Sequence, residues 1–466
     1  MPTIRIFKQY IRLPYVFLAG LDGLMMVLCL YAASLVRFGD LGAADVYMGD
    51  VLPRALTFAL FMLIGMSAMG LYQFKRQEKL SQFCIRLVAA LTAGWIGLAV
   101  LFYVYPGLYA GRSVLLFSLV AAVGAVCIVR PIFHRVMGFA GMRKRVLVLG
   151  AGETAKQIHA SVAEIGGGAL RITGFLPAKN QPTYVPKADL ARANEDRIAD
   201  YCRSERVEEI VLAADDRRNA FPMSQLLECK LMGIPIIECA TFFEREEGRV
   251  KLDALYPGWL VFSDGCSQNI FRSTSKRAFD VVTSLCLLIG TLPVMVVAAI
   301  LIKFEDGWQS PVFYRQQRVG ERGKLFDVLK FRSMRVDAEK NGKAQWASER
   351  DPRITKIGGF MRKTRIDELP QVFNVLRGEM SFVGPRPERP QFTSELAQVI
   401  PYYDERHVVK PGITGWAQIK YPYGASIEDS RSKLEYDLYY VKNHNLMLDL
   451  YVMMTTFEVV LFGKGR

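Results

Sequence analysis

Two adjacent carboxylates, Asp367 and Glu368, are the side chains of this chain best placed to do phosphate chemistry. They follow a basic stretch, and the apolar residues after them recur at helical spacing up to Gly378, a residue type that commonly ends helices. The pattern places Asp367 at or near a helix N-terminus, where backbone N–H groups favour an ionised carboxylate and also attract phosphate. An ionised carboxylate among basic side chains can bind a divalent cation or attack phosphorus. A solvated acidic pair at a helix start is the simpler alternative, and the residues alone leave the roles of the two acids interchangeable.

Basic residues recur on both sides of this pair, each set among apolar, glycine or proline residues. In chain order the motifs are Lys330-Phe331-Arg332-Ser333-Met334, Asp351-Pro352-Arg353, Met361-Arg362, Gly384-Pro385-Arg386-Pro387 and Lys410-Pro411-Gly412-Ile413-Thr414-Gly415-Trp416-Ala417-Gln418. Arginine suits bidentate contacts with phosphate, so this third of the chain is typical of a site for phosphorylated substrates. A basic face against anionic lipid does not exclude that use. The spacing of Ile354, Ile357 and Met361 would also let a helix lie in the membrane interface.

Composition indicates a membrane protein with anionic partners. The chain has 466 residues, of which 51% are hydrophobic, and a formal net charge of +14. Its apolar residues gather in long runs, and its charge fits phosphorylated substrates or anionic lipid. No zinc-ligand spacing, RNA-binding motif or long basic tail supports nucleic acid as a partner. The eight cysteines form no CxxC pair, which indicates reduced packing residues in a cytosol-facing protein.

Four apolar runs in the first third are each long enough to cross a hydrocarbon core of about 30 Å. They cover residues 13–36, 51–72, 83–105 and 113–133. Lysines and arginines gather before the first run, between the second and third, and after the fourth. The positive-inside rule therefore predicts a bundle with both ends in the cytoplasm. Asp22 lies inside the first run with no apparent partner charge, so we expect it to face another helix or to snorkel.

Residues 145–265 are typical of a soluble α/β unit, with strands predicted at 145–149, 171–176, 209–213 and 234–239. The first strand leads into Gly150-Ala151-Gly152-Glu153-Thr154-Ala155, a G-x-G-x-x-A dinucleotide fingerprint at the start of a helix. The acidic residue expected after the second strand is absent, because Pro177 and Ala178 stand there, and no Tyr-x-x-x-Lys reductase motif follows. We predict a Rossmann-like domain with no working cofactor site, used for regulation or assembly.

The apolar segment 276–303 is long enough to span a membrane but contains Pro293 at its middle, which breaks or kinks a helix. Lys276 and Arg277 flank one end, and Lys303 with four further basic residues lies beyond the other. Both flanks therefore favour the cytoplasm. A helix that enters and leaves by the same leaflet satisfies this pattern, provided that neighbouring protein satisfies the backbone at the break.

Residues 275–466 resemble the bacterial sugar transferases, the monotopic phosphoglycosyl transferases that make polyprenyl-diphosphate sugars. The resemblance rests on Lys276-Arg277-x-x-Asp280, the proline-broken hairpin, Asp367-Glu368-Leu369-Pro370-Gln371 and the basic motifs given above from Lys330, Gly384 and Lys410. The preceding helices and α/β unit look like those of large members, such as undecaprenyl-phosphate glucose phosphotransferases of exopolysaccharide assembly. The family often has Ser-Pro at the helix break, where this chain has Leu292-Pro293, so a hydroxyl that would stabilise the break is lost or supplied elsewhere.

The resemblance implies a two-step reaction as the first membrane step of exopolysaccharide assembly. Asp367 would attack the β-phosphate of a UDP-sugar, release UMP and hold the phosphosugar until undecaprenyl phosphate takes it. Glu368 would help to bind Mg²⁺. Arg386 is the first candidate for holding substrate phosphate, and four further residues would assist it: Lys330, Arg332, Arg353 and Arg362. No motif reads hydroxyl stereochemistry, so glucose is an expectation at the level of the family.

The expected fold class is membrane α plus α/β, with three domains. These are a four-helix transmembrane bundle at 1–140, a Rossmann-like cytosolic domain at 141–268 and a mainly helical monotopic catalytic domain at 269–466 with a re-entrant helix at about 276–303. We expect a multi-pass protein of the bacterial inner membrane whose N-terminus and catalytic domain are cytoplasmic. Its expected partners are a UDP-sugar, undecaprenyl phosphate and inner-membrane lipid. A homodimer through the bundle or the Rossmann-like domain is compatible with the sequence, which does not demonstrate it.

Two other functions compete with this interpretation. A nucleotide-sugar dehydratase could use the fingerprint at 150–155, but the missing acidic residue and the missing Tyr-Lys motif argue against it. A membrane scaffold of a polysaccharide assembly complex would need no active site. The intact pair Asp367 and Glu368 with its basic motifs disfavours that alternative.

Overall fold

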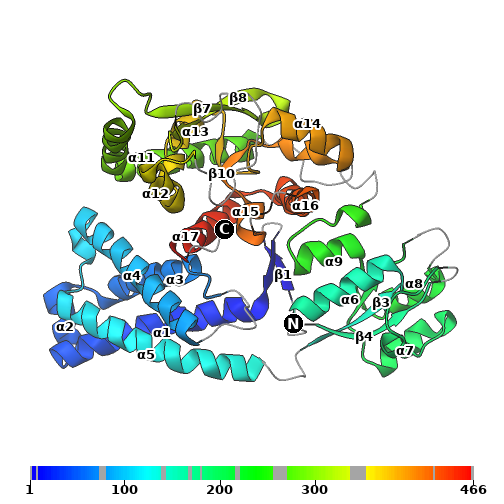
Figure 1. Cartoon of the computed structure of the whole chain (residues 1–466). Coiled ribbons are helices and arrows are strands. Elements are labelled where there is room, and N and C mark those ends of the chain that lie inside the picture. Colours follow the sequence, from blue (N-terminus) through cyan, green and yellow to red (C-terminus); the bar gives the residue numbers. More distant parts are fainter. Residues whose placement is uncertain are drawn as a thin grey trace. The chain divides into compact units, whose positions relative to one another are not determined.

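The computed structural model describes residues 3–6, 9–72, 80–137, 143–165, 170–178, 181–215, 221–255, 270–335, 353–422, 424 and 426–462. It divides into two compact units, Met1–Glu246 and Glu247–Arg466. The described chain is mostly helical, with several apolar helices and a small parallel sheet (Figure 1), so the predicted fold class is confirmed at this level. The division into three domains stays a prediction. Part of the basic loop between the second and third apolar runs (Lys75, Arg76, Lys79) and Asp351-Pro352 of one motif lie outside the described residues.

The four apolar runs of the first unit are helices, as predicted. They form α1 (Leu13–Phe38), α3 (Val51–Ala68), α4 (Leu80–Val104) and α5 (Arg112–Met137), each long and apolar enough to cross a membrane. Helix α1 packs against α5 and α3, and α3 packs against α4. A hairpin of β1 (Thr3–Ile6) and β2 (Gln9–Arg12) precedes α1, and α2 (Leu41–Met48) lies between α1 and α3. With a fifth apolar helix in the second unit, these helices mark the chain as a membrane protein.

Asp22 has a partner charge, so the expectation that it lacks one was wrong. Its Oδ2 atom lies 3.1 Å from NH2 of Arg130 on α5, and the hydroxyl of Tyr72 donates to the same oxygen at 2.9 Å. Only 1% of Asp22 and 3% of Arg130 are exposed, so the carboxylate does not snorkel. Arg130 lies near the end of the fourth apolar run, far from Asp22 in the chain. Because the two residues are joined only by helix packing, local sequence patterns do not reveal the pair.

The α/β part of the first unit is a four-stranded parallel sheet at the predicted places. Its strands are β3 (Lys144–Leu149), β4 (Leu170–Leu176), β5 (Glu209–Leu212) and β6 (Ile236–Glu238), in the order β4-β3-β5-β6. The helices are α6 (Glu153–Ile165), α7 (Ile198–Ser204), α8 (Met223–Leu231) and α9 (Cys239–Glu246). Beyond β4, Leu190 forms a single parallel bridge with Phe175. Counted as a reduced strand, this bridge gives the order 3-2-1-4-5 of the Rossmann fold.

The second unit is mainly helical, with two small two-stranded sheets. Its first half contains α11 (Ile270–Asp306), the antiparallel hairpin of β7 (Phe313–Val319) and β8 (Leu325–Phe331), α12 (Lys356–Thr364), the 3₁₀ turn η8 (Ile366–Glu368) and α13 (Gln371–Arg377). Its second half contains β9 (Ser381–Val383), α14 (Pro390–Val399), η9 (Tyr403–Val408), β10 (Gly412–Thr414), α15 (Trp416–Lys420), α16 (Ile427–Asn443) and α17 (Leu446–Phe462). Strands β9 and β10 pair in parallel. The short segment after α9 also belongs to this unit, because Val250 and Leu252 are buried in its main core and Trp416 donates to the Gly248 carbonyl at 2.6 Å.

Helix α11 contacts the second unit on both sides of Pro293. Before the proline, Asp280 accepts hydrogen bonds from Ser381 and Phe382 at β9, both at 3.0 Å. After it, Met295 and Ile302 pack in a cluster with Phe331 and Met361. The structure assigns α11 as one helix that continues through Pro293, so the predicted break is not seen as an interruption of the helix. The hydroxyl of Thr291, two residues before the proline, donates to the Leu287 carbonyl at 2.7 Å.

One interpretation of α12 was wrong. The sequence analysis placed Ile357 and Met361 against lipid, but both pack against α11, and Met361 is only 2% exposed. Phe360, the residue before Met361, is 61% exposed. Apolar spacing marks the buried face of a helix without saying whether protein or lipid covers it.

Candidate active site

A tight turn between two helices presents the acidic pair. Helix α12 ends at Arg365, whose backbone adopts a left-handed conformation with φ of 61°. Asp367 and Glu368 then form η8, and α13 begins three residues after Glu368. The carboxylates thus lie just before a helix N-terminus, and Gly378 ends that helix with a φ of 84°, as the sequence predicts. A left-handed conformation is uncommon for a residue other than glycine and is often found at functional sites.

Glu368 is held by cations from two other segments. Its Oε1 accepts from NH2 of Arg386 at 2.8 Å and from Nζ of Lys330 at 3.1 Å, and NH1 of Arg365 lies 3.7 Å away. Burial alone would raise the pKa of this carboxyl, but the charges of Arg386, Lys330 and Arg365 outweigh it and hold the pKa well below its ordinary value. Glu368 is therefore an ionised structural centre that joins the turn, β8 and the Gly384–Pro387 loop.

Asp367 is the opposite case. It is only 8% exposed, and its Oδ1 atom has no hydrogen-bond partner in the described part of the chain. Burial raises the pKa of Asp367, the neighbouring charge of Glu368 raises it further, and Lys330, Arg362 and Arg365 lower it only in part. A buried carboxylate oxygen without a partner is costly to stability, which is typical of a group kept for chemistry.

All seven predicted polar site residues line one cavity of the second unit, with a volume of about 1210 Å³. They are Lys330, Arg332, Arg353, Arg362, Asp367, Glu368 and Arg386. The cavity wall carries twelve lysines and arginines but four carboxylates, so its field favours an anionic occupant. The structure thus brings together residues that are up to 56 positions apart in the sequence.

The basic residues differ in what they can still bind. Nε of Arg332 and NH1 of Arg362 are buried and have no hydrogen-bond partner among the described residues. These N–H groups are available to phosphate oxygens, whereas Lys330 and Arg386 already contact Glu368. Arg353 also lines the cavity, and its backbone carbonyl accepts from the Arg335 amide at 3.0 Å.

Another part of the cavity wall is apolar. Helix α11 contributes Leu287, Thr291 and Val294, which flank Pro293, and α17 contributes Met453 and Phe457. Pro293 itself is not among the lining residues. A cavity with a carboxylate, many cations and an apolar wall suits an amphipathic substrate with a phosphate group.

The residues present would fit a magnesium ion only together with a substrate. Among the described residues, no group of three or more histidine, cysteine, aspartate or glutamate side chains is arranged to hold a metal ion. Mg²⁺ is commonly bound by one or two carboxylates, with phosphate oxygens and water completing its shell. The carboxylate of Glu368, which lines the cavity next to Asp367, meets the protein's share of that requirement.

Comparison with known proteins identifies the family. Residues 271–463 match the family model described as bacterial sugar transferase. Over 197 residues the chain is 39% identical to the exopolysaccharide production protein PSS of Rhizobium leguminosarum bv. phaseoli, covering 97% of that relative and 41% of this chain. This chain belongs to the bacterial sugar transferase family.

Two longer members of the family are also similar to this chain. It is 40% identical over 240 residues to a UDP-N-acetylgalactosamine-undecaprenyl-phosphate N-acetylgalactosaminephosphotransferase of Aeromonas hydrophila, covering 52% of this chain and 55% of the relative. It is 33% identical over 273 residues to a UDP-glucose:undecaprenyl-phosphate glucose-1-phosphate transferase of Xanthomonas campestris pv. campestris, covering 58% and 56%. The matched region thus spans about half the length of these two relatives.

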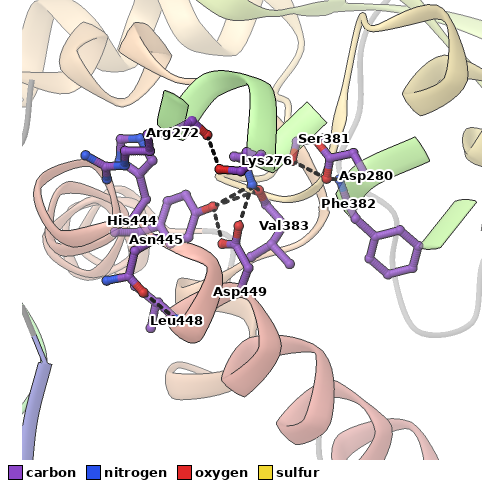
Figure 2. A network of polar contacts seen from close by, with 12 residues as sticks. Arg272, Lys276, Asp280, Ser381, Phe382, Val383, His444, Asn445, Leu448 and Asp449 are labelled. Atoms are coloured by element: carbon purple, nitrogen blue, oxygen red, sulfur yellow. Dashed lines mark hydrogen bonds and ion pairs between the residues drawn. The ribbon is translucent and has the colours of Figure 1, made fainter. Parts of the chain in front are cut away.

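Within the bacterial sugar transferase region, the Lys276-Arg277-x-x-Asp280 motif anchors the start of α11. Figure 2 shows Lys276 and Asp449 reaching toward one another beside Val383, and Lys276 Nζ lies 2.7 Å from Asp449 Oδ2 and 3.2 Å from the Val383 carbonyl. Arg277 donates to the carbonyls of Val375 and Leu376 at the end of α13, at 2.6 and 2.7 Å. From the sequence, these residues indicated only the topology and the family resemblance. Their anchoring role depends on partners about a hundred or more positions away, which no local spacing reveals.

The dinucleotide fingerprint of the first unit already holds an anion of its own chain. The carboxylate of Asp215, which follows β5, accepts from the amides of Glu153 at 2.8 Å and Thr154 at 2.9 Å, at the start of α6. Gly152 is needed for this approach, because a Cβ there would lie 2.0 Å from Asp215 Oδ2. Burial would raise the pKa of Asp215, but the hydrogen bonds from Thr154 and Glu153 outweigh it and lower the pKa. A cofactor phosphate at this helix start would have to displace Asp215.

Proposed function

We propose that this chain transfers a sugar 1-phosphate from a UDP-sugar to undecaprenyl phosphate and releases UMP. The observation that carries the proposal is the buried oxygen of Asp367, which has no hydrogen-bond partner among the described residues and lies in a cavity that is strongly basic and partly apolar. The names of relatives in the same family support it, since they include undecaprenyl-phosphate sugar phosphotransferases.

In the first step, Oδ1 of Asp367 attacks the β-phosphorus of the UDP-sugar. A phosphorus–oxygen bond to the aspartate forms, the bond to the bridging oxygen of the diphosphate breaks, and UMP leaves with the electron pair. A carboxylate needs no base to deprotonate it once it is ionised. Burial also strips hydration water from this oxygen, so less solvent has to be displaced during the attack.

In the second step, a phosphate oxygen of undecaprenyl phosphate attacks the same phosphorus. The bond to Asp367 breaks, the carboxylate is regenerated, and the product is undecaprenyl-diphosphate sugar. The apolar wall from α11 and α17 suits the first isoprene units of the acceptor, which would bring its phosphate to the carboxylate.

The basic residues hold the charge of both substrates. Arg386 is the first candidate for the transferred phosphate, because it already reaches the acidic pair through Glu368. Lys330 also donates to the carboxylate of Glu368. The N–H groups of Arg332 and Arg362 that have no partner among the described residues can bind the other phosphate oxygens. Arg353 would assist them from the same cavity.

Mg²⁺ would be held by Glu368 with phosphate oxygens of the substrate and water. When bound, it offsets the diphosphate charge and stabilises the leaving phosphate. Lys330 and Arg386 would then turn from Glu368 toward the substrate, so the ion pairs of the free protein prepare both cations for that contact.

The membrane arrangement we propose is a four-helix transmembrane bundle followed by a re-entrant helix α11. If α11 crossed a bilayer, Asp280 and Ile302 would lie on opposite sides, yet both contact the same compact unit. Entry and exit through one leaflet avoid this conflict. With the basic flanks, this favours a bacterial inner-membrane protein whose N-terminus and catalytic unit are cytoplasmic.

The pathway step we propose is the first membrane step of exopolysaccharide assembly, with glucose as the first sugar to test. One relative of the family is named an exopolysaccharide production protein. The printed names of the longer relatives include both glucose and N-acetylgalactosamine, so the test must include both sugars. We also propose a homodimer, which the mass of the purified protein in a nanodisc would test.

The test is UMP release by the full chain in nanodiscs, with Mg²⁺, undecaprenyl phosphate and a panel of UDP-sugars. We expect turnover with at least one sugar and, without the lipid acceptor, a single burst of UMP with a phosphosugar bound to the protein. Asp367→Asn should remove both signals. Asp253→Asn is the matched control, because Asp253 pairs with Arg431 elsewhere in the same unit. Unchanged turnover of Asp367→Asn would refute the covalent mechanism, and no UMP from any sugar would favour the scaffold.

A further inference from the structure

The loop that carries Arg386 is held by its carbonyl groups. Four consecutive carbonyls, from Pro385 to Glu388, accept hydrogen bonds from three separate segments of the unit, β7, η9 and β10. The donors are the Gly412 amide at 2.9 Å, NH2 of Arg406 at 2.9 Å, NH1 of Arg318 at 3.1 Å and the Val319 amide at 3.0 Å. Pro385 and Pro387 have no N–H to donate, so the loop depends on these carbonyls for its position.

Arg406 is the more buried of the two side-chain donors. Its side chain is only 7% exposed, and NH2 lies 2.8 Å from Oδ2 of Asp437, which is still more buried. NH1 donates to the Tyr403 hydroxyl at 2.8 Å. Asp437 and Tyr403 therefore fix the guanidinium plane in place, and NH2 is aimed at the carbonyl of Arg386.

Arg318 supports the next carbonyl from the β-hairpin. Its NH2 donates to Gln316 at 2.6 Å, and NH1 lies between the Pro387 carbonyl and Glu388, whose carboxylate is 3.4 Å away. Burial lowers the pKa of Arg318 to about 10, and the nearby charges of Arg386 and Arg389 add to this against the opposing effect of Glu388.

We propose that Arg406 and Arg318 are positioning residues for Arg386. They hold the carbonyls of Arg386 and Pro387, and the side chain of Arg386 is thereby directed at Glu368 and at the substrate phosphate. This inference rests on the proposed function, in which Arg386 binds phosphate. Arg406 and Arg318 also line the cavity, but NH2 of the first and NH1 of the second are engaged by the loop carbonyls. In this proposal they act through Arg386 rather than by touching the reacting atoms.

A double-mutant cycle tests this proposal in the full chain. The variants are Arg386→Gln, Arg406→Gln paired with Asp437→Asn so that no buried charge is left alone, and the combination of all three substitutions. We expect the pair at 406 and 437 to lower kcat/KM about tenfold in the wild type but less than about twofold in the Arg386→Gln background. Arg318→Gln, which removes a half-buried contact, should show the same pattern with a smaller effect, about threefold.

A matched control separates positioning from general loss of structure. Arg249→Gln removes another partly buried arginine of the same unit, which lies 3.4 Å from Glu435. Its effect should be the same with or without Arg386, because Arg249 contacts Glu247 and Glu435, whereas Arg386 contacts Glu368 in the cavity. If the loss caused by the 406 and 437 pair and the loss caused by Arg386→Gln multiply in the combined variant, the positioning role is overturned. Where the pair alone releases no UMP, the affinity for pyrophosphate gives the same comparison.

The cycle is measured on two readouts so that the two hypotheses can fail separately. One is UMP release, and the other is the dissociation constant of inorganic pyrophosphate. A wild type that releases no UMP but shows the coupled loss of pyrophosphate affinity refutes the proposed function and supports the positioning role. A wild type that releases UMP with independent effects refutes the positioning role alone. A wild type that neither releases UMP nor binds pyrophosphate overturns both.

Discussion

Two places in this molecule present hydrogen-bond donors to an anion. They differ in whether an acceptor of the same chain already binds those donors. At the fingerprint of the first unit, the amides of Glu153 and Thr154 are taken by the carboxylate of Asp215. In the cavity of the second unit, N–H groups of Arg332 and Arg362 and an oxygen of Asp367 have no hydrogen-bond partner within the described chain. The first place is satisfied internally, and the second is left to be satisfied by something else.

This difference shows that a sequence motif can predict where hydrogen-bond donors lie, but not whether they are available to a ligand. Gly150–Ala155 has the glycine spacing and the strand-to-helix setting of a phosphate site, and the structure places an internal anion there. The acidic pair has no comparable spacing rule, yet its setting is unfinished without a ligand. In this molecule, the unsatisfied buried groups together with the basic lining of the cavity indicate the candidate site more clearly than the glycine motif does.

The largest effect is expected from Asp367→Asn, which tests whether the cavity of the second unit is the reactive one of the two places. We expect turnover to fall by at least about a thousandfold, because the nucleophile is lost. Stability should be unchanged or higher at neutral pH, because burial raises the pKa of Asp367 and its ionised form opposes folding. The measurements are UMP release and thermal unfolding of the same preparation. A clear loss of stability would contradict the view that this oxygen lacks partners.

Glu368→Gln should sharpen the contrast between the two neighbours. We expect a loss of activity of about a hundredfold and a loss of about 3 kcal/mol of stability, because Lys330 and Arg386 would keep their charges without the carboxylate. Thermal unfolding and UMP release measure both. Glu379→Gln is the control, since that carboxylate accepts from Asn374 outside the cavity lining.

The pH dependence of stability should also separate Glu368 from its variant. The folded-state pKa of Glu368 lies below its ordinary 4.5, so its stabilising contribution is present above that value and is lost as pH falls through the folded pKa. Thermal unfolding of the wild type should therefore weaken more on acidification below about pH 4.5 than that of Glu368→Gln. Parallel curves would show that the ion pairs of Glu368 contribute little.

Asp215→Ala should open the dinucleotide fingerprint to an external anion, because it removes the carboxylate that occupies it. Removal of the carboxylate leaves the amides of Glu153 and Thr154 without their partner and should lower the stability of the first unit by about 1 kcal/mol. We expect inorganic pyrophosphate to restore part of this loss in the variant and to have no such effect on the same unit of the wild type. Hydrogen exchange of the α6 amides reports the first unit alone.

Asp189→Ala controls for the loss of a carboxylate from the same unit, because Asp189 pairs with His159 on the outer part of α6. Pyrophosphate should give it no added protection. Protection of α6 in the wild type by pyrophosphate would show that Asp215 does not close the site.

The smallest effect is expected at Lys156, a cation next to the fingerprint. It pairs with Glu153 at 3.2 Å, and both side chains are exposed. Lys156→Ala should change stability by less than about 0.5 kcal/mol, measured as thermal unfolding, because exposed pairs contribute little. Pyrophosphate should still have no effect on α6, since Asp215 is unchanged. Protection that appears in this variant would show that the pair of Lys156 and Glu153, rather than Asp215, controls access.

Sequence reasoning reached the parts of this protein that local patterns encode. Apolar length predicted the membrane helices, strand runs predicted β3 to β6, and Gly378 predicted the end of α13. Motif order and resemblance also brought Lys330, Arg362 and Arg386 into one expected site, and all three line one cavity with the acidic pair.

The features that sequence reasoning missed depend on distant partners. Arg130 meets Asp22, Asp215 meets the fingerprint, and Arg406 meets the Arg386 carbonyl only after the chain has folded. Spacing rules describe neighbours within a few turns or one strand, so they carry no information on such contacts. A useful signal remained at Asp215, because an acidic residue directly after a Rossmann strand lies at the edge of the sheet where ligands bind.

The end of the apolar helix α11 is connected to the acidic turn through α12. Glu305, near the last turn of that helix, accepts from the amides of Lys356 and Ile357 at 2.8 and 3.1 Å and so caps α12. Helix α12 leads directly into Arg365 and the turn with Asp367 and Glu368. Because α12 alone separates the Glu305 cap from the acidic turn, we expect a change in how deeply α11 lies in lipid, in the membrane arrangement proposed above, to shift the turn as well. Acyl chain length of the surrounding lipid is therefore a property to which the geometry of the acidic turn should respond.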